Sequence, residues 1–175
     1  MGEGYGFSCK NCGYTFEANL GIGFMFPSVY EEVMNKARSG KLGTDVQKFL
    51  MEHPDGALNC GTAVLRCTKC RELETDLSYD MYVPKRKQQA EPKDGELSSA
   101  FPFEGAKYVM PMDLISDYDL VQRYPHRCAK CNGEMESISK GKQTRYGYEE
   151  VIDKRKLRCP HCRQPLVMSN VLMWD

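Results

Sequence analysis

The sequence predicts a small α+β fold: two β-hairpin units, each built around cysteines, the first carrying a two-helix insertion. Three observations predict it. Eight of the nine cysteines form four Cys-x-x-Cys pairs. Short segments beside these pairs alternate apolar and polar residues, as half-buried strands do. Two segments between the first and second pairs instead repeat apolar residues at helical spacing.

The strands are expected on either side of the cysteine pairs, because each pair sits in a turn. In the first half of the chain, the expected strands are Phe7–Cys9, Tyr14–Glu17, Thr62–Cys67 and a longer one at Leu73–Val83. In the second half, they are Glu134–Ser139, Lys156–Arg158 and Leu166–Trp174. Asp113–Tyr124 has a weak helical pattern, and the polar run Lys140–Tyr148 is expected to be a loop.

The first inserted helix is expected to begin near Ser28. Ser28 and Glu31 have the spacing of a capping box, and Pro27 precedes them. Gly40 is a suitable stop. The helix buries one stripe: Tyr30, Val33, Met34 and Ala37.

A second inserted helix is expected to follow at once. Thr44 and Gln47 repeat the capping signal, and His53-Pro54 ends the segment. Its buried face is Val46, Phe49 and Leu50.

A change of composition divides the chain. Residues 85–99 contain almost no apolar side chain and include Pro92 and Gly95, which is typical of a linker or flexible loop. The predicted units are therefore 1–84 and 100–175. The 41% of hydrophobic residues is low for a domain of this size. Bound metal would compensate, because the free energy of metal binding is also folding free energy.

The spacing of the cysteine pairs indicates structural metal sites. Two intervening residues let a tight turn aim both sulfurs at one point, and zinc takes four such ligands. Four pairs supply eight ligands, which fill two sites and leave none over. The predicted ligands of the two Zn²⁺ ions are Cys9, Cys12, Cys67, Cys70, Cys128, Cys131, Cys159 and Cys162.

The pairs can combine in three ways. We favour sequential pairing, with Cys9/Cys12 joined to Cys67/Cys70 and Cys128/Cys131 joined to Cys159/Cys162, because it closes the shorter loops. Nested and interleaved arrangements stay open.

The segments Cys9–Gly13 and Cys159–Pro165 resemble the knuckles of zinc-ribbon and rubredoxin-like proteins. The whole pattern, with Gly23–Pro27 before a helix and a closing Trp-Asp, also resembles a group of bacterial zinc-ribbon proteins of unassigned function. The resemblance implies a metal site on a ribbon-like hairpin and no particular activity. The chain departs from rubredoxin because 54 residues separate Cys12 from Cys67.

The remaining cysteine and the histidines have plainer interpretations. Cys60 is expected to be a small buried hydrophobic residue rather than a reactive thiol or an exchanging ligand. His53, His126 and His161 are expected to support the ligands or lie on the surface.

The expected function is non-enzymatic: a structural-zinc protein acting as a protein-interaction or regulatory module in the cytoplasm. No catalytic motif accompanies the cysteines, and no secretory signal or membrane span is evident. The partner and the oligomeric state stay open. Val109–Met112 and Leu166–Trp174 are candidate contact segments.

Two alternative functions stay open. Residues 126–175 carry 10 basic and 6 acidic residues, which allows nucleic-acid binding through the C-terminal unit. The basic clusters are Lys85–Lys87, Lys140–Arg145 and Lys154–Arg158. The second alternative is a zinc-thiolate redox sensor; a dithiol redox site is less favoured, since no pair has a βαβ setting.

Overall fold

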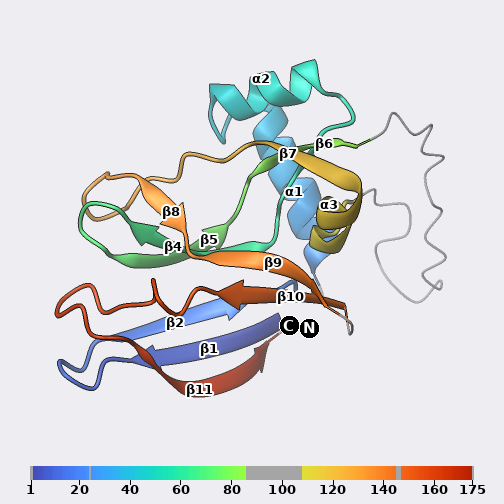
Figure 1. Ribbon diagram of the computed structural model, residues 1–175. Coiled ribbons are helices and arrows are strands. Elements are labelled where there is room, and N and C mark those ends of the chain that lie inside the picture. Colours follow the sequence, from blue (N-terminus) through green and yellow to red (C-terminus); the bar gives the residue numbers. More distant parts are fainter. Residues whose placement is uncertain (1, 24, 86–107, 145–146, 175) are drawn as a thin grey trace. The chain divides into compact units, whose positions relative to one another are not determined.

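A computed structural model describes residues 2–23, 25–85, 108–144 and 147–174 (Figure 1). The described residues form an α+β structure of helices and small antiparallel sheets, which agrees with the predicted class. The chain forms two compact units. Unit 1 contains residues 1–23, 61–78 and 125–175, and unit 2 contains residues 24–60 and 79–124.

This division differs from the sequential one expected at 1–84 and 100–175. Each unit is assembled from separated segments, because strands from the two ends of the chain pair with each other. Of the predicted 85–99 linker, only Lys85 lies within the described residues.

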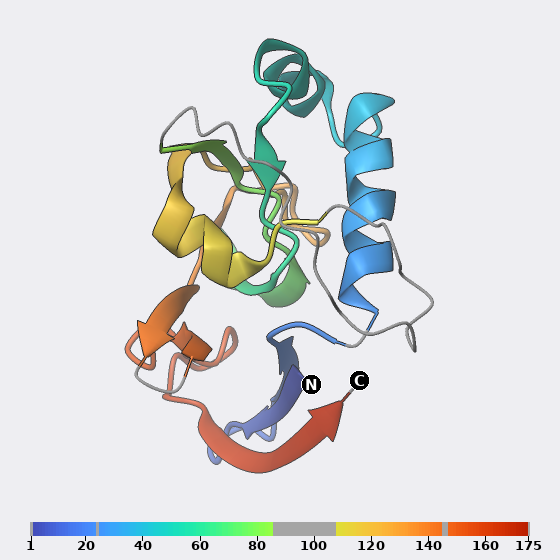
Figure 2. The ribbon, with the colours of Figure 1, turned by 90° about the vertical axis from the view of Figure 1, so that its right-hand side faces the viewer.

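The first sheet of unit 1 joins the two ends of the chain. Its strands are β1 (Gly2–Ser8), β2 (Thr15–Leu20) and β11 (Val167–Trp174), in the order β11-β1-β2 (Figure 2). Both pairings are antiparallel, and β1 shifts register against β11 between Gly6 and Phe7. The expected final strand at Leu166–Trp174 is confirmed.

A second sheet of unit 1 contains β4 (Thr62–Cys67), β5 (Leu73–Leu77) and β8 (Met135–Ser137), in the order β5-β4-β8. The strand expected at Thr62–Cys67 is confirmed. A hairpin of β9 (Ser139–Thr144) and β10 (Gly147–Ile152) follows β8. The loop expected over this region was therefore wrong.

Apolar side chains from these strands form one core. Along β2, burial alternates strictly, as expected for a sheet with one face covered. The core also includes two of the ligand candidates. Its buried members are Phe7, Cys9, Phe16, Ala18, Leu20, Val64, Leu73, Ile138, Leu157, Cys159 and Leu166.

Unit 2 contains all the described helices. They are α1 (Phe26–Arg38), α2 (Thr44–Glu52) and α3 (Pro111–Asp117). Its sheet has the order β3-β6-β7, from Ala57–Leu58, Met81–Pro84 and Tyr118–Gln122. Within the described residues, every helix is too short or too polar to cross a membrane.

The predicted apolar stripe of α1 is confirmed, because Tyr30, Val33, Met34 and Ala37 are all buried. The predicted start was wrong by two residues. The helix begins at Phe26 without a side-chain cap, with Pro27 in its first turn, where proline's missing N–H costs nothing.

Two other segments differ from the expectation. The single strand expected at Leu73–Val83 is broken at Tyr79, whose φ of 54° is left-handed, and its halves belong to different units. The weak helix at Asp113–Tyr124 ends at Asp117. Residues 118–122 form β7, in keeping with the β propensity of tyrosine and valine.

Candidate metal centres

All four cysteine pairs adopt the same backbone turn. The amide N–H of each first cysteine donates to the carbonyl oxygen five residues later, and its own carbonyl accepts from the amide four residues later. For Cys9 these N–O distances are 2.8 and 2.9 Å, and for Cys159 they are 2.9 and 3.0 Å. Cys67 and Cys128 make the same two bonds. The knuckle is thus a structural repeat, although the sequences around the four pairs are not alike beyond the cysteines.

The residue after each pair has a left-handed backbone. The φ angles are 73° at Gly13, 66° at Arg71, 56° at Asn132 and 65° at Arg163. Glycine and asparagine adopt this conformation at low cost, whereas arginine does not. The turn therefore forms even where the local sequence opposes it.

The eight sulfurs gather into two groups of four. We call Cys9, Cys12, Cys159 and Cys162 the terminal group, and Cys67, Cys70, Cys128 and Cys131 the internal group. Within each group, all Sγ atoms lie within 4.8 Å of one another. All eight predicted ligand residues are present in these groups.

The pairing is nested, so the sequential pairing we favoured was wrong. Cys9 Sγ lies 3.4 Å from Cys162 Sγ, and Cys12 Sγ lies 3.4 Å from Cys159 Sγ. The antiparallel pairing of β1 with β11 carries the first and last knuckles to the same place. In the internal group, Cys67 and Cys131 sulfurs are 3.5 Å apart.

These separations fit a tetrahedral metal ion. Four thiolates at about 2.3 Å from zinc lie about 3.8 Å from one another. The shortest sulfur–sulfur distances in the two groups, from 3.4 to 3.7 Å, are close to that value and far longer than a disulfide bond of about 2.05 Å. Each group could therefore hold one metal ion.

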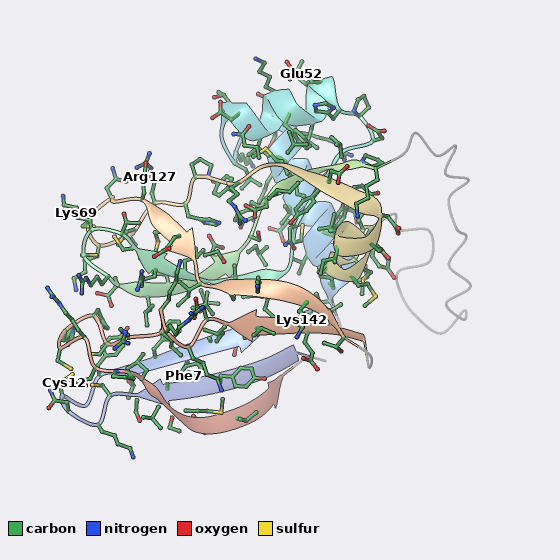
Figure 3. The ribbon with its side chains drawn as sticks, in the orientation of Figure 1. Phe7, Cys12, Glu52, Lys69, Arg127 and Lys142 are labelled. Atoms are coloured by element: carbon green, nitrogen blue, oxygen red, sulfur yellow. The ribbon has the colours of Figure 1, made fainter. Side chains whose placement is uncertain are left out.

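Hairpin tips position the ligands. In the terminal group, one knuckle connects β1 to β2, and the other precedes β11. In the internal group, one knuckle connects β4 to β5, and the other precedes β8. Cys12 and Lys69, on different hairpins, lie at the same end of unit 1 (Figure 3).

Burial differs within every pair. The first cysteine of each is at most 2% exposed, while the second is half-buried or exposed. Each group therefore has two sulfurs anchored in the protein and two facing outward. Of the four second cysteines, Cys12 is the most exposed.

The local backbone favours thiolates, which are the metal-binding form. Burial acts to raise the pKa of Cys67, but the amides of Cys70 and Lys69 outweigh it and lower that pKa to about 6. The amide of Gln164 and the side chain of Asn11 lower the pKa of Cys162 to about 6. One sulfur with a lowered pKa lies in each group. Burial raises the pKa of Cys128 to about 12. At Cys12 the backbone hydrogen bond acts to lower the pKa, but the hydrogen bond with Cys159, burial and the other two sulfurs together outweigh it and raise that pKa to about 12.

A short polar chain joins the two groups. Tyr14, two residues after Cys12, packs its ring edge-on against His161, with centroids 5.1 Å apart. Its hydroxyl donates to Glu72, 3.4 Å away, and Lys130 donates to the same carboxylate at 2.7 Å. Burial and the Glu72 charge raise the pKa of Tyr14 to about 12, so it stays a neutral donor.

Glu136 makes a second connection. Its carboxylate accepts hydrogen bonds from Arg66 on β4 and, at 2.6 Å, from Lys156, which precedes the last knuckle. The Lys156 and Arg66 bonds lower the pKa of Glu136 against the effect of burial. The roles of Tyr14, Glu72 and Glu136 beside the cysteine groups were not predicted from the sequence, although Tyr14 and Glu72 each lie two residues after a knuckle.

The leftover cysteine and the histidines lie outside both groups. Cys60 is 2% exposed in unit 2, and burial raises its pKa to about 12. His126 is buried, and its Nε2 lies 2.9 Å from the carbonyl oxygen of Ser78. His161 is exposed and makes the edge-on ring contact with Tyr14, and His53 belongs to unit 2.

The predicted basic clusters are partly neutralised. Lys156 pairs with Glu136, Arg155 pairs with Asp153, and Lys142 lies opposite Glu149 on the β9–β10 hairpin. Arg86, Lys87 and Arg145 lie outside the described residues.

Comparison of the chain with protein-family profiles, with curated proteins and with solved structures finds no match. The residues themselves therefore carry the functional argument. They form two four-cysteine groups, each suited to one metal ion, in a metal-binding module.

Proposed function

We propose that the chain is a structural zinc protein that binds one Zn²⁺ in each cysteine group and acts, without catalysis, as a protein-interaction module. The observation that carries this proposal is the convergence of eight sulfurs from four hairpin tips into two groups within 4.8 Å. Zinc suits four thiolates in tetrahedral geometry.

Four-cysteine coordination supports the proposal that the metal sites have no catalytic role. A catalytic zinc keeps a position open for water or substrate, whereas four cysteine thiolates fill the tetrahedron. The ions would instead hold together hairpins whose shared core is small. Each ion would tie segments far apart in sequence, since Cys12 and Cys159 are 147 residues apart.

Metal analysis and chelation test the proposal together. Purified protein should contain two zinc ions per chain by elemental analysis. A strong chelator should remove them and abolish the near-UV circular dichroism of unit 1, which contains Tyr5, Phe7 and Phe16. Re-addition of zinc should restore the signal. Metal-free protein that keeps this signal contradicts the proposal, and two iron ions per chain would contradict only the choice of metal.

Redox sensing is a second candidate, favoured by the exposure of Cys12. Hydrogen peroxide would accept two electrons from two thiolates of the terminal group and two protons from solvent, giving one disulfide and two water molecules and releasing Zn²⁺. One equivalent of peroxide per chain should then release one zinc ion and oxidise only cysteines of the terminal group. Equal oxidation of both groups contradicts it.

Nucleic-acid binding receives less support. The acidic partners of Arg155 and Lys156 reduce the charge of the C-terminal cluster. If the C-terminal cluster of the chain bound nucleic acid, reversing the charges of Lys154 and Arg155 would abolish salt-dependent binding.

A further inference from the structure

The sheet β11-β1-β2 ends in a long strand whose outer edge has no partner among the described strands (Figure 2). An edge strand presents a row of N–H and C=O groups that can pair with another chain. Proteins usually protect such edges with charged residues, proline or short length.

The other edge strands in the described part of the chain are protected in that way. β3 has only two residues, and each longer edge strand described there, apart from β11, contains at least one charged residue. These residues are Glu17 in β2, Glu74 and Asp76 in β5, Asp119 in β7, Glu136 in β8, Lys140 and Lys142 in β9, and Glu149 and Glu150 in β10.

β11 departs from this pattern throughout its length. Its sequence, Val-Met-Ser-Asn-Val-Leu-Met-Trp, contains no charged residue, proline or glycine. Three of its apolar side chains are also exposed: Val167 is 42% exposed, Met168 46% and Val171 53%. Because neighbouring residues of a strand point to opposite faces, Val167 and Met168 expose apolar surface on both faces of the sheet.

From these observations we infer that β11 pairs antiparallel with β11 of a second copy of the chain, across a two-fold axis. The two three-stranded sheets then form one continuous six-stranded sheet. This inference rests on the proposed interaction role and names its partner.

Charge is the reason for choosing a second copy. Two-fold pairing places a strand against itself, so any charged residue near the axis would face a like charge. β11 is free of that repulsion, whereas the charged edge strands are not. A charged peptide, in contrast, would gain no ion pair from an uncharged strand.

Sedimentation velocity of the zinc-loaded full chain tests the inference. Wild-type protein should sediment as a dimer at high concentration and dissociate on dilution. Val171→Lys should be monomeric at all protein concentrations. Val171 lies near the middle of β11, so the substitution would bring two lysines together in the dimer. The matched control is Val121→Lys on β7: Val121 is 51% exposed and should tolerate lysine without loss of the dimer.

Hydrogen exchange locates the interface. The amides of residues 167–174 should exchange several-fold more slowly at high protein concentration in the wild type, and at the same rate at all concentrations in Val171→Lys. A monomeric wild type, a dimeric Val171→Lys or loss of the dimer in Val121→Lys would each overturn the inference. Zinc content is measured in the same samples, so two ions per monomeric chain would refute the dimer and leave the metal proposal standing.

Discussion

The two cysteine groups use the same knuckle at very different distances along the chain. Cys70 and Cys128 of the internal group are 58 residues apart, whereas Cys12 and Cys159 of the terminal group are 147 apart. The knuckle determines how two sulfurs are presented, and it carries no information about its partner. Strand pairing selects the partner, β1 with β11 for one group and β4 with β8 for the other.

The largest effect should come from removing one whole group. Replacing both buried anchors of the internal group, Cys67→Ser with Cys128→Ser, should eliminate one zinc ion and unfold unit 1. The binding free energy of a structural zinc site, about 10–16 kcal/mol in zinc-finger peptides, exceeds the stability of a typical domain. Elemental analysis and circular dichroism measure both effects. The control Cys60→Ala, outside both groups, should keep two ions. Loss of a metal ion from this variant would show that the ligand assignment is wrong.

A smaller effect should come from Glu136, which connects β8 and β4 to the segment before the last knuckle. Glu136→Gln should lower the free energy of unfolding by about 1–2 kcal/mol, because charged hydrogen bonds to Arg66 and Lys156 are lost. The measurement is denaturant unfolding with zinc in excess.

The pH dependence of this difference follows from the lowered pKa of Glu136. A carboxyl whose pKa is lowered on folding stabilises the protein fully above its unfolded pKa of about 4.3, and loses that effect only as the pH falls further. The gap between wild type and Glu136→Gln should thus stay constant from neutral pH to about pH 5.5. A gap that shrinks in this range would show that Glu136 does not form these bonds.

Alanine substitutions at two glycines should affect metal binding by the two groups to different extents. A Cβ at Gly133 would lie 3.1 Å from Cys67 Sγ and 3.2 Å from Cys131 Sγ, whereas one at Gly13 would meet nothing within 4 Å. Gly133→Ala should therefore weaken metal binding at the internal group by roughly 1–3 kcal/mol. Gly13→Ala should cost only about 1 kcal/mol, through its left-handed φ.

Competition with a chelator measures both glycine effects. The ranking of the two losses in metal affinity matters more than the size of either loss. A larger loss for Gly13→Ala would mean that crowding of the sulfurs is not what requires glycine at position 133.

The smallest expected effect is the order in which the groups lose metal. The longer loop of the terminal group costs about 0.8 kcal/mol more to close, and Cys12 is exposed. Under limiting chelator, thiol alkylation read by mass spectrometry should label Cys9, Cys12, Cys159 and Cys162 first. Earlier labelling of the internal group would contradict the expectation that the terminal group loses its metal first.

The sequence predicted the local features well and the long-range pairing badly. The knuckles, the buried stripe of α1 and the strand Thr62–Cys67 depend on neighbouring residues, so the pattern of residues reveals them. The nested pairing depends on β1 meeting β11. Loop closure favours sequential pairing by only about 1.5 kcal/mol, which the seven paired positions between β1 and β11 outweigh.

Other errors have the same origin. The polar run Lys140–Thr144 forms β9 because its backbone pairs with β10, not because its side chains favour a strand. The break at Tyr79 occurs where the chain passes from unit 1 to unit 2, and no glycine or proline marks it.

Cadmium-113 NMR tests the nested grouping most directly. With ¹¹³Cd in place of zinc, through-bond couplings connect each metal to the β-protons of its own cysteines. The structure predicts that one cadmium couples to Cys9, Cys12, Cys159 and Cys162 and the other to Cys67, Cys70, Cys128 and Cys131. A single cadmium coupled to both Cys9 and Cys67 would contradict it.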